Sequence, residues 1–300
     1  MRTRRFLLCL LTISLAAPLG AQRRHSHSIN INRLGFRGND ICEDQLMISE
    51  DGEPGIYAEE TRSLANQPLN VTASKNGGVS VTDWDQPQFS IKLCKAAAGE
   101  NAKELLSQIS LSVDGGRISV NGPEFQSDWS ASILIKAPAG AKLELHAKNG
   151  GISLFKTNAT VTAHAVNGGI ALAHVHGTVD AEARNGGISV DDSGGNVIAR
   201  VENGGISLRL GSSWDGGKLV ASSENGGINV ELPGDFRSSL ELAGSGHSYM
   251  ECHAQACDHG QRTWDDEHRY FRIGSGEPVV KASTENGSVE VSDVTAEDDL

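Results

Sequence analysis

Residues 149–172 read NGGISLFKTNATVTAHAVNGGIAL, and this stretch decides the fold because it contains one full period of a repeat. The triplet Asn-Gly-Gly opens it at Asn149 and returns 18 residues later at Asn167. The same triplet recurs with the same spacing at Asn185 and Asn203. A fixed period of this length indicates a repeat architecture in which each unit packs only on its neighbours.

Each repeat unit is predicted to contain two β-strands, one on either side of the Asn. After the Asn, large aliphatic residues alternate with small ones, as in Ile152, Ser153 and Leu154. Before the Asn, Val161 and Ala163 keep the same alternation. A period of two residues is typical of a strand with one buried face. We therefore expect an all-β fold of about 18-residue, two-strand coils with Asn-Gly-Gly turns.

The coils are expected to stack, because a single coil cannot cover its apolar face or pair its backbone groups. Stacking at ~4.8 Å supplies the missing hydrogen bonds and favours a parallel β-solenoid. Glycine in the turn permits a positive φ, and the Asn side chains can form a hydrogen-bonded ladder between coils. Two-residue hairpins at Asn-Gly are the alternative, but the strict period of both strands favours the solenoid. The turn residues are Asn76, Asn149, Asn167, Asn185, Asn203, Asn225 and Asn286.

The N-terminus has the pattern of a secretory signal peptide over residues 1–21. Three arginines precede an apolar run, 6–17, that is too short for a transmembrane helix. We expect cleavage after Ala21, export to the periplasm or the outer cell surface, and a flexible basic tail over 22–28. Cleavage takes the net charge from −12 to −15, which disfavours nucleic acid and anionic lipid as partners. An acidic tail is expected over 293–300, and no membrane insertion is expected.

The rest of the chain is predicted to divide into an irregular and a regular part. Residues 29–142 are expected to form irregular coils, with a degenerate turn at 114–116. Helical spacing of apolar residues predicts a short amphipathic helix over 100–108, which would cover an open edge. Residues 143–292 are expected to form the regular solenoid, interrupted by an insertion at 234–279.

Four cysteines remain after cleavage, an even number in a chain predicted to be exported, which favours two disulfides. Three connectivities are open. Proximity in the sequence suggests Cys252–Cys257 and therefore Cys42–Cys94.

Other candidate chemistry is sparse. His247, His253 and His259 lie beside the second cysteine pair and have the residue types of a metal site, but an oxidising compartment favours the disulfide. Polysaccharide-cleaving β-helices use carboxylates clustered on one face, and Asp191 and Asp192 are a single pair with no acidic column around it. We therefore expect no catalytic residues, no metal ion and no cofactor.

Two further groups of residues have a functional and a structural interpretation. Histidines are expected in one outward column of adjacent coils, continued by a glutamate and an arginine, and a solvated face is favoured there over a ligand site. Tryptophans can stack on sugars, but packing against the ends or loops of a solenoid is favoured. These residues are His146, His164, Glu182 and Arg200 for the column, His174 and His176 in a neighbouring turn, and Trp84, Trp129, Trp214 and Trp264.

A family resemblance rests on longer stretches of sequence. Residues 133–141 read ILIKAPAGA and lead through Leu143 and Leu145 to the first regular turn, and a final coil ends at Asn286-Gly287. In these stretches the chain resembles the bacterial putative-adhesin family of β-strand-repeat domains, which are auto-transporter-adhesin-head-like domains of unknown function. The resemblance covers roughly residues 70–292. It implies a right-handed parallel β-helix and no defined catalytic residues.

The sequence thus predicts a non-catalytic, exported β-solenoid that acts as an adhesin-like binding or structural module of the cell envelope. We expect its partner to be a protein or polysaccharide of the envelope or surface. A self-associating periplasmic scaffold is one alternative. A carbohydrate-active β-helix enzyme is another.

Overall fold

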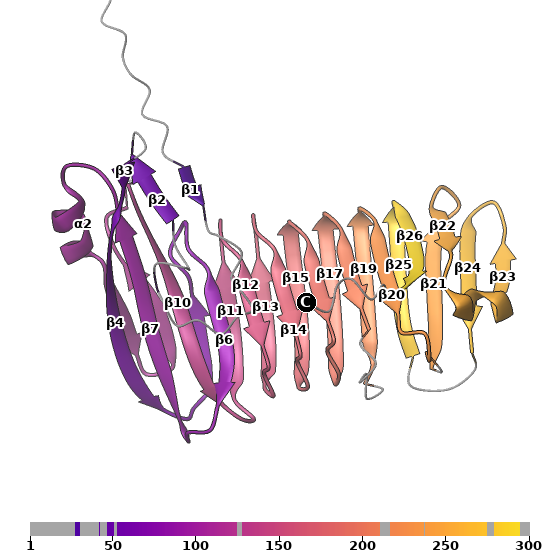
Figure 1. Cartoon of the computed structure of the whole chain (residues 1–300), viewed down its shortest axis with the longest axis horizontal. Helices are drawn as coiled ribbons and strands as arrows, with labels where there is room; N and C mark the ends of the chain where they lie inside the picture. The colour runs from indigo at the N-terminus through magenta and orange to yellow at the C-terminus, as the bar shows by residue number, and fades with distance from the viewer. Residues whose placement is uncertain are drawn as a thin grey trace, which may run out of the picture.

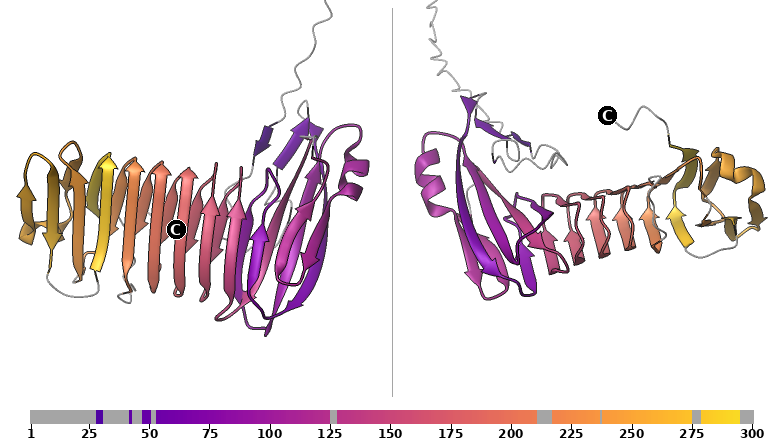
Figure 2. Two further views of the ribbon diagram at one scale, coloured as in Figure 1. Left: turned by 180° about the vertical axis from the view of Figure 1, so that it is seen from behind. Right: turned by 60° about the horizontal axis from the view of Figure 1, so that its bottom comes forward.

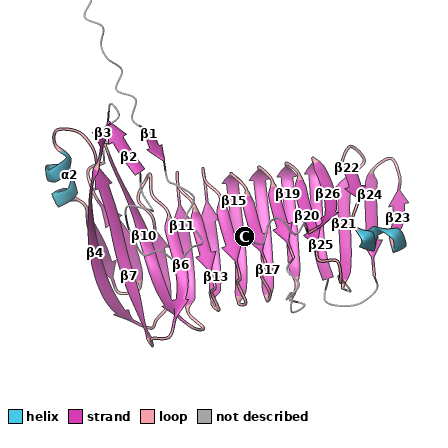
Figure 3. Ribbon diagram, viewed as in Figure 1, coloured by secondary structure: helices cyan, strands magenta, loops and turns pink. Residues whose placement is uncertain are grey.

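The computed structural model describes residues 28–30, 42, 47–50, 53–124, 128–210, 217–236, 238–274 and 279–294. The predicted signal peptide, the basic tail before Ser28, the turn at Trp214 and the acidic tail beyond Val294 lie outside these residues. The molecule is elongated, and its strands lie side by side across the long axis (Figure 1). It is an all-β protein in which the helical segments lie at the two ends (Figure 3).

Two large, mostly parallel sheets make up the body, and we name them sheet I and sheet II. Sheet I has eleven strands, in the order β22 (Tyr249–Cys252), β26 (Ser288–Asp293), β20 (Ile228–Leu232), β18 (Ile206–Arg209), β16 (Ile188–Asp191), β14 (Ile170–Ala173), β12 (Ile152–Phe155), β6 (Val79–Trp84), β10 (Trp129–Pro138), β7 (Gln88–Ala97) and β4 (Ile56–Ala65). Sheet II has twelve, in the order β23 (Gln261–Trp264), β24 (His268–Ile273), β21 (Ser239–Ser245), β25 (Val279–Asn286), β19 (Leu219–Asn225), β17 (Asn196–Asn203), β15 (Thr178–Asn185), β13 (Thr160–Ala165), β11 (Lys142–Ala147), β5 (Leu69–Thr72), β9 (Arg117–Asn121) and β8 (Ser110–Asp114).

The remaining elements are small. A three-stranded sheet is formed by β1 (Ser28–Asn30), β2 (Met47–Glu50) and β3 (Glu53–Pro54). The helical segments are α2 (Ala102–Gln108) and the 3₁₀ helix η1 (Gln255–His259). Neither is long or apolar enough to span a membrane. The amphipathic helix expected over 100–108 is confirmed as α2, which buries Ala102, Leu105 and Leu106.

From β11 to β20 the chain alternates between the two sheets, one strand in each. Neighbouring strands up to β18 pair in parallel with an 18-residue offset, so that Val161 faces Val179 and Ile170 faces Ile188. The offset is 22 residues where β17 and β18 pair with β19 and β20. The columns of the sequence alignment are therefore the ladder columns of the two sheets. The strand orders leave both sheets open at their ends in the described part of the chain.

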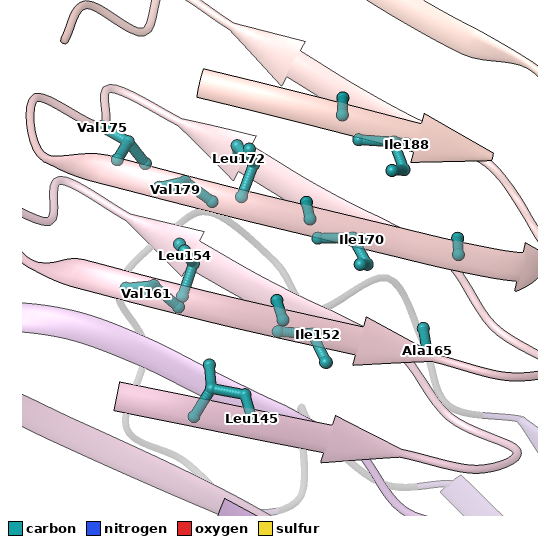
Figure 4. Close-up of a cluster of buried hydrophobic side chains, with 14 of the residues drawn as sticks. Leu145, Ile152, Leu154, Val161, Ala165, Ile170, Leu172, Val175, Val179 and Ile188 are labelled. Atoms are coloured by element: carbon teal, nitrogen blue, oxygen red, sulfur yellow. The ribbon is translucent and has the colours of Figure 1, made fainter. Parts of the chain in front are cut away.

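The core lies between the two sheets, because each strand turns one face inward. Ile152 and Leu154 of sheet I, each at most 1% exposed, lie opposite Leu145 and Val161 of sheet II (Figure 4). Burying each such side chain stabilises the fold by about 1.5–3 kcal/mol. Sheet I contributes large side chains to the core, and sheet II contributes small ones such as Ala163, which is fully buried.

The order of strands in space departs from the chain order at both ends. β25 and β26 follow β21–β24 in the sequence, yet they lie between that segment and β19–β20 (Figures 1 and 2). The segment 234–279, expected as an insertion, thus contributes the outermost strands of both sheets, with Leu240 facing Val280 and Met250 facing Val289. At the other end, β5 and β6 similarly lie between β9–β10 and β11–β12. Antiparallel strands finish both sheets at the N-terminal end and sheet II at the other end, where sheet I finishes with the parallel strand β22.

Two expectations for the N-terminal coils are resolved by the strand register. Val71 is one residue out of phase with Asn76 in the sequence, yet it faces Leu145, because the intervening turn is one residue longer. The expected degenerate coil turn at 114–116 is wrong. Asp114 faces Arg117 across an antiparallel two-residue hairpin in which Gly115 has a φ of +57°, a conformation that glycine adopts without strain.

The Asn residues of the turns form a hydrogen-bonded ladder along one edge of sheet II. From Asn149 onward, each side-chain amide donates to the side-chain oxygen of the Asn in the preceding coil of the stack, at 2.9–3.2 Å. The ladder runs through Asn76, Asn149, Asn167, Asn185, Asn203, Asn225 and Asn286.

The glycines of the turns are required for a reason that differs from the sequence-based expectation. Among the described motif glycines, only Gly204 has a positive φ. The first glycine of each triplet instead lies against the backbone of the adjacent coil. A Cβ on Gly186 would lie 2.3 Å from the carbonyl oxygen of Gly168, and one on Gly168 would lie 2.2 Å from that of Gly150. Close approach of backbones therefore excludes a side chain there.

Both predicted cysteine pairs are confirmed. Cys42 and Cys94 form a disulfide with a Cα–Cα distance of 5.2 Å, and Cys252 and Cys257 form one with a Cα–Cα distance of 5.9 Å.

Candidate functional site

The outward face of sheet II carries the predicted column of polar residues. His146 faces His164, which faces Glu182, which faces Arg200. The two imidazole rings stack, with centroids 5.3 Å apart, and Nδ1 of His164 lies 3.6 Å from Oε2 of Glu182. The side chains follow one another along the column and do not converge on a common point, which supports a solvated face at this position.

Further along the same column, the outward side chains become short and a groove opens. After Arg200 the column continues with Ser222 and Ser283, which face each other on β19 and β25. The groove has a volume of about 750 Å³. Its lining includes Glu182, Arg200, Glu202, Ser222, Glu224, Ser245, Glu267, His268, Ser283 and Glu285. Short side chains on the floor and long glutamates at the rim therefore create the hollow.

The groove is acidic. Five glutamates line it against one arginine. The arginine, Arg200, is paired with Asp180, and Nε of Arg184 lies 3.3 Å from Oε2 of Glu202. Glu224 and Glu285, which flank Asn225 and Asn286, are exposed. This surface favours a cationic ligand.

A second hollow on sheet II provides a contrast. It has a volume of about 590 Å³ and lies over β5, β9, β11 and β13. Its charged lining residues are balanced: Arg117 and Lys142 stand against Asp114 and Glu144. Its charges give it no preference for either sign of ligand.

Sequence reasoning identified Glu182 but missed the other four groove glutamates. Three of them occupy the position directly before the motif Asn, where Glu202, Glu224 and Glu285 follow Arg184 in successive coils. The same alignment that identified the apolar columns therefore contained this acidic column. A second signal was the change from long side chains to serine in the neighbouring outward column.

The Asp191–Asp192 pair does not form a two-carboxylate site. Asp191 faces Arg209 in the ladder of sheet I. Asp192 has a φ of +39°, and its Oδ2 lies 3.0 Å from Nδ1 of His174 in the preceding coil. Asp191 thus has Arg209 as its ladder partner, while Asp192 lies within hydrogen-bond distance of His174.

The histidines near the second disulfide are dispersed. Cys252 and Cys257 are bonded to each other and supply no thiolate ligand. His247 and His259 are exposed, and His253 has Nε2 3.3 Å from Oε2 of Glu251. The alternative of a metal site built from these histidines and the cysteines is therefore not assembled, and His253 has a carboxylate neighbour in Glu251.

The described tryptophans lie near the ends of the molecule. Trp84 and Trp129 donate Nε1–H hydrogen bonds to the carbonyl oxygens of Gln88 and Pro123, at 2.7 and 3.1 Å. Trp264 on β23 is 49% exposed. The structural interpretation of Trp84 and Trp129 is supported by these hydrogen bonds.

Four described carboxylates have a perturbed pKa: that of Asp83 is raised, and those of Glu241, Glu251 and Asp265 are lowered. Burial raises the pKa of Asp83, against a backbone hydrogen bond from Asn158 that lowers it, and Oδ1 of Asp83 is buried without a partner among the described residues. The hydrogen bond from Lys281, at 2.7 Å, holds the pKa of Glu241 below its usual range, and the charge of Arg272 acts in the same direction. Glu241 thereby links β21 to β25 and β24.

Known structures with partial similarity are a cell adhesion protein and two adhesins, all described as putative. The protein from Clostridium sporogenes is 11% identical, with a TM-score of 0.34, and the match covers 80% of this chain and 100% of that one. The adhesin from Bacteroides fragilis is 12% identical, with a TM-score of 0.35 and coverage of 79% and 97%. The adhesin from Parabacteroides merdae is 9% identical, with a TM-score of 0.36 and coverage of 82% and 98%.

Each of these TM-scores is below 0.5, so the similarities carry no argument about the activity of this chain. No family model matches the chain, and no curated protein is similar to it in sequence.

Proposed function

We propose that the two sheets are the two walls of one right-handed parallel β-solenoid. The alternation of successive strands between the sheets and the 18-residue offset of ladder partners support this architecture. The right hand is the one expected of parallel crossover connections. An experimental map in which the coils can be traced tests the proposal, and a left-handed path would refute it.

We propose that the protein is a non-catalytic, exported, adhesin-like binding module of the cell envelope, which holds a basic protein segment in the groove of sheet II. The observation that carries the proposal is the groove itself, with five glutamates and one arginine around a serine floor. Strands in a sheet lie ~4.8 Å apart, so Glu202, Glu224 and Glu285 present carboxylates at short, regular intervals. Such a row favours a partner with several cationic side chains over a single small ion.

The proposal that the module is non-catalytic is supported by the environment of its carboxylates. Asp191 faces Arg209 in the ladder of sheet I, and Asp192 lies within hydrogen-bond distance of His174 in the preceding coil. A pair of carboxylates that acts on a glycosidic bond must instead face one substrate from two sides. Release of product from a glycan panel, lost on replacing both aspartates, would favour the enzyme alternative and refute this part of the proposal.

Binding is tested by fluorescence anisotropy with a labelled lysine-rich peptide and a glutamate-rich peptide of equal length. The lysine-rich peptide should bind, and the double variant Glu224→Gln/Glu285→Gln should bind it roughly tenfold more weakly. The control is Asp114→Asn/Glu144→Gln, which removes the same charge from the balanced hollow on the same sheet. Equal weakening in both variants would show that only net charge matters and would refute the groove as the site.

Location and assembly are tested separately. Protease treatment of intact cells should remove the mature chain if it is displayed on the outer surface, as adhesion requires. Protection until the envelope is opened would place it in the periplasm and argue against adhesion. Oligomers of the purified protein that form without ligand would favour the self-associating scaffold.

A further inference from the structure

A second group of ligand-type side chains lies on the outward face of sheet I, at the end formed by β22 and β26. Glu251 of β22 directly faces Glu290 of β26. His253 follows β22, and its imidazole approaches the carboxylate of Glu251. Each of these three residues places one ligand atom within 4.8 Å of the ligand atoms of the other two.

The facing pair of glutamates is an exception on this sheet. Among the described ladder partners of sheet I, it is the one pair with like charge. Elsewhere on the same face the signs alternate, as where Arg209 faces Asp191 on one side and Glu231 on the other. Like charges directly opposite each other destabilise a sheet. A bound cation between Glu251 and Glu290 would remove that repulsion.

We propose that Glu251, His253 and Glu290 form a binding site for a divalent transition-metal ion of the zinc class. One imidazole nitrogen and two carboxylate oxygens are ligands that Zn²⁺ accepts, with water in the fourth position. Ca²⁺ and Mg²⁺ prefer all-oxygen sites, so the imidazole disfavours them. Ligands bound at ~2.0–2.1 Å in a tetrahedron lie roughly 3.3 Å apart, so side chains that start within 4.8 Å need only small rotations.

The site is held in place from several directions. The backbone N–H of His253 donates to the carbonyl oxygen of Val291 at 2.7 Å, and the adjacent Cys252 is fixed by its disulfide. The hydroxyl of Tyr249 donates to Oε1 of Glu251 and orients that carboxylate. Hydrogen bonds from surrounding groups to the ligand residues keep those residues in position for the metal. The bound ion would join the outermost strand of sheet I to the final strand of the chain.

The test is isothermal titration calorimetry of the full mature chain, without an affinity tag, with ZnCl₂ and separately with MgCl₂. We expect saturable binding of Zn²⁺ that weakens at least tenfold in Glu290→Gln and in His253→Gln. The control Glu231→Gln makes the same chemical change on the same face of sheet I, outside the cluster, and should bind Zn²⁺ as the unaltered chain does. Mg²⁺ should bind at least tenfold more weakly than Zn²⁺.

Several results would overturn the proposal. They are the absence of saturable Zn²⁺ binding, equal affinity in the two ligand variants and the unaltered chain, and equal binding of Mg²⁺. Because the altered side chains of Glu290 and His253 are exposed, the variants should remain folded, and circular dichroism checks this. The groove lies on the other sheet, so success or failure here is independent of the peptide-binding test.

Discussion

Replacing Gly186 with Ala should disrupt the stack of coils, whereas the same change at Gly187 should be tolerated. A Cβ on Gly186 would lie 2.3 Å from the carbonyl oxygen of Gly168. A Cβ on Gly187 would lie 3.0 Å from the carbonyl oxygen of Gly205. The first contact requires two backbones to separate, while the second requires a shift of a few tenths of an ångström. The two adjacent glycines therefore form a matched pair.

The expected magnitudes follow from these contacts. Overpacking of this kind typically costs about 1–3 kcal/mol. Separation of the coils also weakens nearby hydrogen bonds, such as that between Asn185 and Asn167, and each lost bond costs about 1 kcal/mol. We expect Gly186→Ala to lower the free energy of unfolding by about 2–5 kcal/mol. Gly187→Ala should change it by less than about 1 kcal/mol, because the lower chain entropy of Ala in the unfolded state offsets the tight contact.

Urea unfolding followed by circular dichroism measures both free energies, and hydrogen exchange locates the damage. In Gly186→Ala, amides of β13 and β15, which flank the contact, should exchange faster than those of β4 and β7 at the far end, since each coil contacts only its neighbours. If the two variants are equally stable, or if Gly187→Ala is the more damaging, the close-approach explanation of the Asn-Gly-Gly motif is refuted.

Three further predictions concern the ladder and two of the perturbed carboxylates, Asp83 and Glu241. Asn185→Ala removes two side-chain hydrogen bonds and should lower the free energy of unfolding, measured by thermal unfolding, by about 1–2 kcal/mol. Asn286→Ala removes one such bond and should cost about half as much. Equal losses of stability in the two variants would contradict the ladder. Because the pKa of Asp83 is raised on folding, ionisation of Asp83 destabilises the fold, fully so above its folded pKa. Asp83→Asn should raise the melting temperature at pH 7 and have no such effect well below pH 3.8, and a gain that is independent of pH would refute this. The pKa of Glu241 is lowered by Lys281, so the stabilisation that its ionised carboxylate provides is present above pH 4.5 and is lost as the pH falls through the pKa of the folded state. Glu241→Gln should therefore flatten the dependence of stability on pH in that range. An unchanged dependence would refute this prediction.

The interior of the fold could be predicted from the sequence because it repeats. Ile152 and Ile170 lie in one column of the alignment and face each other in sheet I, so period alone places them. Gly115 could not be placed in the same way. Its Gly-Gly pair resembles a coil turn but closes a hairpin, because the strands before and after it are antiparallel neighbours.

The ends of the molecule also escaped prediction, and the reason is topological. The regular solenoid expected on either side of the insertion is found, with β25 paired to β19 and β26 to β20. What was not predicted is that the intervening segment returns as β21 and β22 beyond β25 and β26, which is a long-range choice. The alternation of apolar and polar residues around Leu240 and Met250 predicts strands, but it does not predict which strands they pair with. The disulfide pairing was accessible because Cys252 and Cys257 are close in sequence and leave a single partner for each remaining cysteine.

The candidate sites lie where a repeat column changes, and this follows from what a repeat does. A regular column places similar side chains one strand spacing apart, so His146 and His164 stack in a row and do not converge. Convergence of different groups needs a break in the column. In sheet II the break is the change from Arg200 to Ser222, which opens the groove. In sheet I it is the change from Asn229 to Glu290, where the neutral ladder meets facing carboxylates. The regular coils thus set the spacing, and the irregular last layers supply the chemistry.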